Sequence, residues 1–345
     1  MKKILLFGEP LIRITPLNSE KINDSTKTTM FYGGSEINIA RTLAGFCQSS
    51  KVFTALPNNE IGKSFLKFMK QNQIDTSSIC LTGERIGLYY LENGYGVRNS
   101  DVYYDRKYTS INEIDEKSLN INKIFEDVTH FHFSGITVAI SASVRKILHL
   151  LLEEARKRNI IISMDLNLRT KMISISEAKK QFSLFAKYAD YCFGIEPLMV
   201  DEQDINMFDR NNANEKTIES RMQALKKVFG FQAIFHTIRN VNESNINTYQ
   251  CYCLSDKFYR SITLKTSLLE RVGSGDAFVA GALYQIINNA PIQKTIDFAI
   301  ASGTLKCTIP GDSMNEEINK IEALLKTNLE ISRWKICQNQ IQLSN

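Results

Sequence analysis

Short apolar runs alternate with segments of helical periodicity through the second half of the chain. Four apolar runs are predicted to be buried strands, at residues 130–133, 160–164, 191–193 and 232–237. Between them, apolar residues recur at helical spacing over 143–158, near 176–188 and up to about 229. Strands that alternate with helices are typical of a parallel sheet with helices on both faces. We therefore predict an α/β fold of the Rossmann type.

The first hundred residues follow a different pattern. A short apolar run at 3–7 predicts one more core strand, but residues 11–32 alternate irregularly, as do the Tyr-rich strands predicted at 87–91 and 102–105. Alternation is typical of strands with one exposed face. We expect the segments 11–32 and 87–105 to form a small separate β sheet, with amphipathic helices at 35–46 and 61–71.

The last hundred residues are predicted to be mostly helical. Antiparallel edge strands are expected at 248–254 and 259–264, followed by helices at 276–289, 292–307 and 314–326. Neither a repeat nor a low-complexity linker interrupts the pattern, so residues 1–345 are interpreted as one domain that carries the small sheet.

Composition narrows the class of protein. Apolar residues make up 43% of the chain and charged residues 23%, which is ordinary for a globular protein. The net charge of +5 is not gathered into a basic block, so we expect no nucleic-acid partner.

The initial apolar run stops at Gly8, too early for a signal peptide, and no run is long enough to span a membrane. Seven cysteines without Cys-x-x-Cys spacing indicate reduced thiols. We expect a cytoplasmic protein.

The main candidate for chemistry is the turn Gly273-Ser274-Gly275, which leads into a helix that opens with Asp276. Two glycines around a small residue let successive N–H groups point the same way, and the helix adds its positive end. Such a corner binds anions and stabilises charge on a transferring phosphoryl group. Asp276 is expected to be ionised and free to accept a proton. The alternative is an ordinary loop in which Asp276 is the helix N-cap.

Other nucleotide and metal signatures are weak. Gly62-Lys63-Ser64 imitates the end of a Walker A loop, but Pro57 replaces its first glycine, and no Gly-x-Gly-x-x-Gly follows the first strand. His130 and His132 share one strand face without a third ligand at metal spacing. We assign neither a P-loop nor a metal site.

Two further patterns suggest ligand binding. Gly33-Gly34 allows a ligand close to the backbone, and Asn38 lies one helical turn later, within reach of sugar hydroxyls. Arg106 and Arg169 each follow a predicted strand, and arginines capture carboxylates or phosphates in a bidentate manner. For either arginine alone, a solvated surface charge is the competing interpretation.

The motifs together resemble those of the ribokinase-like (PfkB-type) carbohydrate kinases, and within them the 2-keto-3-deoxygluconate kinases. The resemblance covers nearly the whole chain and is carried by seven ordered motifs: Phe7-Gly8-Glu9-Pro10, Gly33-Gly34-x-x-x-Asn38-x-Ala40, Gly87-Leu88-Tyr89-Tyr90, Tyr103-Tyr104-Asp105-Arg106, Asp165-Leu166-Asn167-Leu168-Arg169, Arg271-Val272-Gly273-Ser274-Gly275-Asp276-Ala277-Phe278 and Leu305-Lys306-Cys307-Thr308-Ile309-Pro310-Gly311-Asp312.

The resemblance implies a ribokinase-like core, a small β lid formed by 11–32 and 87–105, and a homodimer or higher oligomer through that lid. It implies ATP-dependent phosphorylation of 2-keto-3-deoxygluconate to 2-keto-3-deoxy-6-phosphogluconate, with Asp276 as the general base. Gly273, Ser274 and Gly275 would hold the transferring phosphoryl group. The implied substrate residues are Gly34, Ser35, Asn38, Tyr89, Tyr104, Arg106, Arg169 and Asp276. The implied ATP residues are Asn167, Arg169, Thr237, Arg239, Gly273, Gly275 and Lys306.

The sequence departs from the family pattern at the motif associated with Mg²⁺ and phosphate. Ile195 stands where the Asn of Asn-x-x-Glu is usual, and only Glu196 or Asp201 would be available to act through water. Mg²⁺ is still the expected cofactor and a monovalent cation is an option, but no residue is assigned to the metal. The alternatives are a kinase for a neutral sugar such as fructose, and a catalytically weak sugar- or nucleotide-binding relative.

Overall fold

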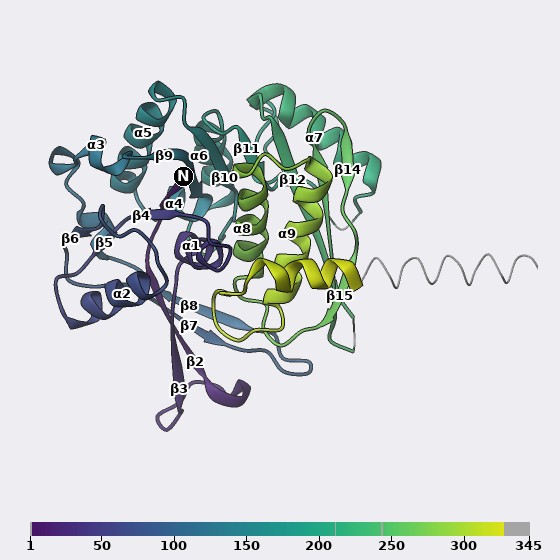
Figure 1. Cartoon of the computed structure of the whole chain (residues 1–345). Coiled ribbons are helices and arrows are strands. Elements are labelled where there is room, and N and C mark those ends of the chain that lie inside the picture. The colour runs from purple at the N-terminus through teal and green to yellow at the C-terminus, as the bar shows by residue number, and fades with distance from the viewer. Residues whose placement is uncertain (1, 211, 243, 328–345) are drawn as a thin grey trace, which may run out of the picture.

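The computed structural model describes residues 2–210, 212–242 and 244–327, and a nine-stranded sheet forms its centre (Figure 1). Six strands are parallel, in the order β12-β11-β10-β9-β1-β4, and β13 continues the sheet antiparallel to β12. β14 and β15 both pair with β13. The bounds are β1 Lys3–Phe7, β4 Ser50–Phe53, β9 Val128–Ser134, β10 Ile161–Asp165, β11 Tyr191–Phe193, β12 Ala233–Val241, β13 Ile246–Leu254, β14 Phe258–Arg260 and β15 Leu264–Ser267.

Helices cover both faces of this sheet, as the alternating pattern predicts (Figure 1). Their bounds are α1 Ser35–Gly45, α2 Glu60–Gln71, α3 Ile121–Ile124, α4 Gly135–Ile140, α5 Ala142–Lys157, α6 Ile175–Ala186, α7 Glu215–Phe229, α8 Ser274–Ile287 and α9 Ile292–Lys306. Short 3₁₀ turns are η1 Leu17–Ser19, η2 Ser110–Glu113 and η3 Glu116–Ser118.

Two boundary predictions were wrong. The strand expected at 259–264 is divided into β14 and β15, because both short strands pair with the long β13 on its free side. The helix expected at 314–326 begins only at 318, after an irregular segment in which Met314 is buried. An apolar residue that anchors a loop in the core has the same sequence signature as the first residue of an amphipathic helix.

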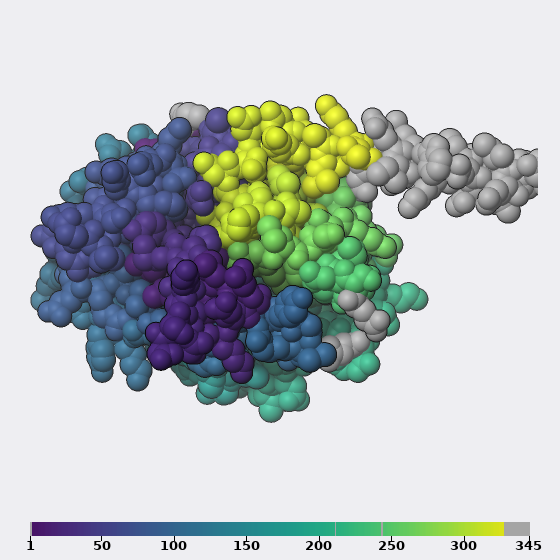
Figure 2. All heavy atoms as spheres, turned by 90° about the horizontal axis from the view of Figure 1, so that it is seen from below, coloured from purple at the N-terminus to yellow at the C-terminus, as the bar shows by residue number. Residues whose placement is uncertain are grey.

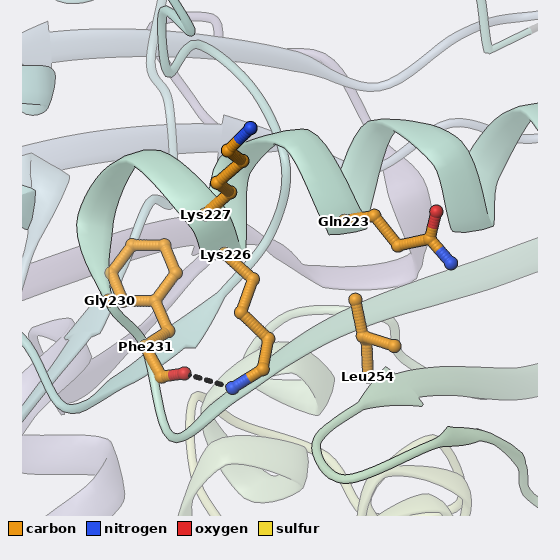
Figure 3. A pocket seen from close by; sticks show the side chains of 6 residues that line it. All are labelled: Gln223, Lys226, Lys227, Gly230, Phe231 and Leu254. Atoms are coloured by element: carbon orange, nitrogen blue, oxygen red, sulfur yellow. Dashed lines mark hydrogen bonds between the residues drawn. The ribbon is translucent and has the colours of Figure 1, made fainter.

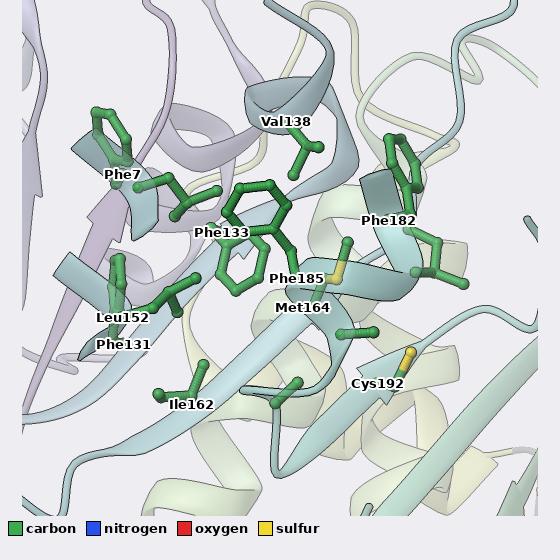
Figure 4. Close-up of a cluster of buried hydrophobic side chains, with 14 of the residues drawn as sticks. Phe7, Phe131, Phe133, Val138, Leu152, Ile162, Met164, Phe182, Phe185 and Cys192 are labelled. Atoms are coloured by element: carbon green, nitrogen blue, oxygen red, sulfur yellow. The ribbon is translucent and has the colours of Figure 1, made fainter. Parts of the chain in front are cut away.

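Two hydrophobic clusters lie on the two faces of the sheet. Successive residues of a strand point to opposite faces, and β1 accordingly sends Leu5 and Phe7 into one cluster and Ile4 and Leu6 into the other. The first cluster packs β9 and β10 against α5 and α6, with Phe131 and Phe133 at its centre (Figure 4). Because both faces are buried, the strands are continuous apolar runs.

A second, four-stranded sheet projects from the main body and is built from two separate pieces of chain (Figure 1). Its order is β3-β2-β7-β8, with bounds β2 Leu11–Pro16, β3 Thr28–Gly33, β7 Gly87–Glu92 and β8 Asp101–Asp105. A two-stranded pair, β5 Ala55–Leu56 and β6 Cys80–Leu81, lies elsewhere. The predicted fold class, a large mostly parallel sheet with flanking helices and a small separate sheet, is confirmed.

The small sheet begins at the carboxyl end of β1, because only three residues separate β1 from β2. Asp165 and Ser134 end β10 and β9 at the same edge, which is where open α/β sheets bind their ligands. The predicted site residues are therefore expected beneath the small sheet. Within the described residues, no helix combines the length and apolar character needed to cross a membrane.

Candidate active site

The helix α8 begins at Ser274, two residues before the start predicted at Asp276, so only Gly273 of the predicted glycine turn precedes it and Ser274 and Gly275 belong to its first turn. Gly273 is the N-cap of the helix, with φ 75° and ψ −2°, a left-handed conformation that favours glycine. A Cβ atom at this position would lie 1.7 Å from the carbonyl oxygen of Asp312. The adjoining N–H groups of the first helical turn have no partner earlier in the helix. The N–H of Ser274 donates to the carbonyl oxygen of Arg271 at 3.2 Å, so the N–H groups of Gly275 and Asp276 are the donors of this turn that an anion could use.

Asp276 lies in the first turn of α8 with only 9% of its surface exposed. Ser35 Oγ donates a hydrogen bond of 2.9 Å to its Oδ1, and Asn38 Nδ2 donates one of 2.7 Å to its Oδ2. Both donors lie on α1, whose N-cap Gly34 has φ 113°. Asp276 is therefore not the N-cap, and its carboxylate is already hydrogen-bonded on both oxygens. The carboxylate of Asp276 therefore lies where the first turns of α1 and α8 meet, and each of these helices has a glycine as its N-cap.

Burial makes the site a cluster of carboxyl groups with elevated pKa values. Desolvation raises the pKa of Asp276, while the hydrogen bonds from Asn38 and Ser35 and the charges of Arg169 and Arg239 lower it. Desolvation likewise raises the pKa of Asp165 and of Glu36 to about 7 each, and the charge of Asp276 adds to both shifts. A carboxylate whose pKa is raised toward the working pH is a better general base.

Asn167 joins the carboxyl end of β10 to this cluster. It has φ 31°, which lies in the left-handed region that asparagine tolerates. Its side-chain amide donates a 3.2 Å hydrogen bond to Ser35 Oγ, and its backbone N–H donates to Asp165 Oδ1 at 3.2 Å. The loop after β10 is thereby held against the start of α1.

The predicted arginines have different surroundings. Arg106 donates from Nε to Glu9 Oε2 at 2.8 Å and is largely buried in this ion pair. Arg169 is exposed, and its guanidinium donates to the adjacent carbonyl of Leu168. Arg239 donates to Ser274 Oγ at 3.0 Å, beside the glycine corner. Of the three, Arg169 is the one with an exposed side chain and no acidic partner in the described structure.

The remaining predicted residues are distributed around the corner. The rings of Tyr89 and Tyr104 lie 6.4 Å apart on β7 and β8, and the Tyr89 hydroxyl donates to Asp312. Thr237 lies within β12, opposite Cys251. Lys306 is fully buried, and its Nζ donates to the carbonyl of Ile309 at 2.8 Å. Its ammonium group is thus occupied inside the protein.

The segment expected to serve the metal is instead an internal ion-pair network. Ile195 is fully buried, and the buried Glu196 lies 2.9 Å from Arg221 and 3.5 Å from Lys179. Throughout the described ranges, no group of three or more His, Cys, Asp or Glu residues is arranged to hold a metal ion. These side chains do not fit a protein-held Mg²⁺ at this position.

One surface hollow lies away from the site. It has a volume of about 410 Å³ at the end of α7 and is lined by Gln223, Lys226, Lys227, Gly230, Phe231 and Leu254 (Figure 3). Lys226 donates to the carbonyl oxygens of Phe231 and Gln232. None of the predicted site residues lines this hollow.

One functional candidate escaped the sequence prediction. Arg13 lies on β2 and is fully buried between Glu270 and Asp312, the acids on either side of the glycine corner. Its neighbours Ile12 and Ile14 made it look like the exposed residue of an alternating strand. The pairing of Arg13 with residues some 260–300 positions later in the chain leaves no local signal.

Comparison with known proteins agrees with this geometry. The family model for pfkB family carbohydrate kinases matches residues 1–319. The crystal structure of a 2-dehydro-3-deoxygluconokinase from Thermotoga maritima superimposes with a TM-score of 0.85 at 30% identity, covering 94% of this chain and 98% of that one.

Two curated proteins are similar over nearly their whole length. The 2-dehydro-3-deoxygalactonokinase of Haloferax volcanii is 25% identical over 325 residues, which cover 94% of this chain and 96% of that protein. The 2-dehydro-3-deoxygluconokinase of Thermoproteus tenax is 23% identical over 342 residues, with 94% and 95% covered.

Proposed function

The chain belongs to the pfkB family of carbohydrate kinases, and from that premise we propose that it transfers the γ-phosphoryl group of ATP to the terminal hydroxyl of 2-keto-3-deoxygluconate. The product is 2-keto-3-deoxy-6-phosphogluconate. Asp276 takes the proton of the hydroxyl as the oxygen bonds to phosphorus. In this proposal the N–H groups of Gly273, Gly275 and Asp276 face the charge that develops on the transferring phosphoryl group, whereas the N–H of Ser274 donates to the carbonyl of Arg271 in this structure.

The observation that carries this proposal is the placement of Asp276. It combines a carboxylate held on both oxygens by Ser35 and Asn38 with a raised pKa and a position in the first turn of α8. Phosphoryl transfer depends chiefly on positioning and on electrostatic stabilisation. A base fixed beside a set of backbone donors supplies both.

The acidic nature of the substrate is supported by Arg169. Its guanidinium is exposed, yet close enough to lower the pKa values of Asp165 and Asp276. An arginine without an acidic partner at the edge of a carboxylate cluster is available for a carboxylate supplied by the substrate. Arg106 then acts indirectly, by pairing with the buried Glu9 and holding the base of the small sheet in place. The implied substrate role of Arg106 stays a prediction.

ATP is the phosphoryl donor of a carbohydrate kinase, and Mg²⁺ is proposed to arrive with it. Because the carboxylate of Glu196 is already paired with Arg221 and Lys179, we assign no protein carboxylate to the ion. No step is routed through a protein-held metal. Arg239, which donates to Ser274 beside the corner, is the cation proposed to face the nucleotide phosphates.

We also propose a homodimer through the small sheet. Met30, Ile14, Tyr90 and Tyr103 lie directly opposite one another across four strands and so share one face. Met30 and Tyr103 are 53% and 49% exposed. Ile14 and Tyr90 between them are partly exposed, and a row of apolar side chains at least partly open to solvent on one sheet face is typical of an interaction surface. Light scattering of Met30→Lys and Tyr103→Lys should report a monomer where the unmodified protein is a dimer.

A second substrate is favoured by one comparison. The Haloferax volcanii relative is a 2-dehydro-3-deoxygalactonokinase, so the C4 epimer of the proposed substrate is the second candidate. The two acids share the carboxylate, the keto group and the terminal hydroxyl. They differ in one hydroxyl that the residues above do not distinguish.

A turnover panel tests the proposal. The purified protein is supplied with ATP and Mg²⁺ and with 2-keto-3-deoxygluconate, its C4 epimer, fructose or ribose, and ADP release is followed while the product is identified by mass spectrometry. We expect kcat/KM for the keto-deoxy acid to exceed that for either neutral sugar at least about tenfold, since one charge-assisted hydrogen bond contributes roughly that factor. Equal turnover of fructose would reject the sugar-acid assignment, and no turnover of any sugar would favour a binding protein.

A further inference from the structure

Arg13 is among the largest fully buried side chains in the described part of the chain, although it belongs to the small sheet. Its Nη1 is paired with Glu270 Oε1, and its Nε lies 2.9 Å from Asp312 Oδ1. The guanidinium also stacks over the ring of Phe31, 4.4 Å from its centroid. A guanidinium is retained in the interior only where opposite charges compensate for lost hydration.

The row of the sheet that contains Arg13 faces the site. Arg13 lies directly opposite Phe31 on β3 and Tyr89 on β7, and Tyr89 lies opposite Tyr104 on β8. Residues directly opposite one another share a face. Tyr89 also donates its hydroxyl to Asp312, so two neighbours in this row contact the same carboxylate. The N-terminal and C-terminal segments that carry these residues lie side by side in Figure 2.

The two acids that hold Arg13 also define the glycine corner. Glu270 precedes Gly273 by three residues, and its Oε2 accepts a 2.6 Å hydrogen bond from the N–H of Gly311. The carbonyl oxygen of Asp312 occupies the space where a Cβ on Gly273 would lie. Moving either carboxylate therefore moves the backbone against which the corner is packed.

Arg13 supplies positive charge that keeps these acids together. The pKa of Asp312 is raised by burial to about 6, and the charge of Arg13 opposes that rise. Lys306 is also buried nearby, but its ammonium group donates to the carbonyl of Ile309. Without Arg13, the partly buried Glu270 and the buried Asp312 would be two neighbouring acids that repel each other.

We propose that Arg13 is a positioning residue that connects the small sheet to the phosphoryl-binding corner, so that the sheet and the donors of Gly273–Asp276 move as one unit. This inference rests on the proposed function, because the corner is the place where ATP and the sugar meet. Arg13 touches neither reactant. It acts through Glu270 and Asp312.

The test compares Arg13→Met, which removes the charge, with Arg13→Lys, which keeps it. Arg98→Met is the control, because Arg98 lies on the β7–β8 connection and its guanidinium donates to the backbone carbonyls of Ser19 and Asn93 and to no acid in the described part of the chain. We expect Arg13→Met to lower kcat about 10- to 100-fold at a temperature where circular dichroism shows it folded. Arg13→Lys should recover part of the loss, and Arg98→Met should leave kcat within about twofold.

Hydrogen exchange supplies a readout that does not need turnover. ATP with Mg²⁺ should slow exchange in 273–280 and also in 11–16 and 87–92 of the unmodified protein. In Arg13→Met the slowing should persist in 273–280 and disappear from the two sheet segments. If the variant does not fold, Glu270→Gln, which keeps the shape of the side chain, should give the same uncoupling.

Two results would overturn the proposal. One is a folded Arg13→Met with the kcat of the unmodified protein. The other is equal slowing of the sheet segments by ATP with and without Arg13. Absence of sugar turnover in the unmodified protein would count against the proposed function instead, and the exchange experiment would still decide on the connection.

Discussion

The side-chain amide of Asn38 donates a 2.7 Å hydrogen bond to Oδ2 of Asp276, although 238 positions separate the two residues. The bond joins the first turns of α1 and α8. Hydrogen bonding to the ionised form of a carboxyl group favours that form, so Asn38 keeps the pKa of Asp276 below the value that burial alone would impose. The pair sets the protonation state of the proposed base.

Replacing Asp276 by Asn should remove the base while preserving its volume. General-base catalysis contributes about 10²- to 10⁴-fold, and we expect kcat to fall by that order. The measurement is steady-state turnover of the best sugar of the panel. Binding of ATP by calorimetry is the control, and it should change little. A variant that turns over at half the normal rate would exclude Asp276 as the base.

Replacing Asn38 by Ala should move the acid limb of the pH–rate profile to higher pH. Loss of the donor raises the pKa of Asp276 further, so the base becomes protonated at a higher pH than in the unmodified enzyme. The measurement is kcat from pH 5 to 9. Because Ser35 still donates to Oδ1, activity should remain on the alkaline side. If the acid limb of the profile stays at the same pH in Asn38→Ala, the group that titrates there is not Asp276.

Gly273 should be much less tolerant of alanine than another glycine with the same φ. Gly273 and Gly230 both have φ 75°, but a Cβ on Gly230 meets nothing within 4 Å, whereas one on Gly273 lies 1.7 Å from Asp312 O. We expect Gly230→Ala to cost about 1 kcal/mol of stability, which is the left-handed penalty alone. Gly273→Ala should cost more and should also reduce kcat.

The measurements for this pair are urea denaturation and turnover. The comparison isolates the contact with Asp312, because the backbone conformation is matched. If both variants lose the same stability and keep the normal kcat, the backbone at Asp312 must shift to accommodate the new methyl group without displacing the glycine corner.

Alanine substitution at Arg169 should affect catalysis, whereas alanine substitution at Arg106 should affect stability. Arg169→Ala removes an exposed guanidinium without an acidic partner in the described structure, so kcat/KM for the sugar acid should fall about 10- to 100-fold with little change in Tm. Arg106→Ala leaves the buried Glu9 unpaired and should destabilise the protein by about 3–5 kcal/mol. Kinetics and thermal melts on both variants check this. A stable Arg106→Ala with lost sugar binding would reverse the assignment.

The sequence predicted the sheet and the corner because their signals are local. Apolar runs identify strands that are buried on both faces, and Gly273-Ser274-Gly275-Asp276 contains its own turn and helix start. The contacts of the site could not be predicted in the same way. The substrate roles expected of Ser35 and Asn38 stay predictions, and the sequence did not indicate that both side chains donate to the carboxylate of Asp276. Such pairings depend on how distant segments meet.

Glu36 provides the clearest pH effect on stability. Burial raises its pKa from 4.5 to about 7, so the folded protein binds more protons than the unfolded chain between those values. Stability therefore falls as pH rises from about 4.5 to 7, by roughly 1.4 kcal/mol for each pH unit between the two pKa values. Ser134 and Thr137 donate to Oε1, whereas Oε2 is buried without a hydrogen-bond partner in the described structure.

Glu36→Gln keeps an acceptor for Ser134 and Thr137 and cannot ionise. Relative to the unmodified protein, its free energy of unfolding should therefore improve between pH 5 and pH 8 by on the order of 3 kcal/mol. Urea denaturation at the two pH values measures the change, and Glu202→Gln, an exposed glutamate, is the control whose difference should not vary with pH. A pH-independent difference for Glu36→Gln would mean that Glu36 remains ionised in the folded protein, with its charge compensated at the meeting point of α1 and the sheet.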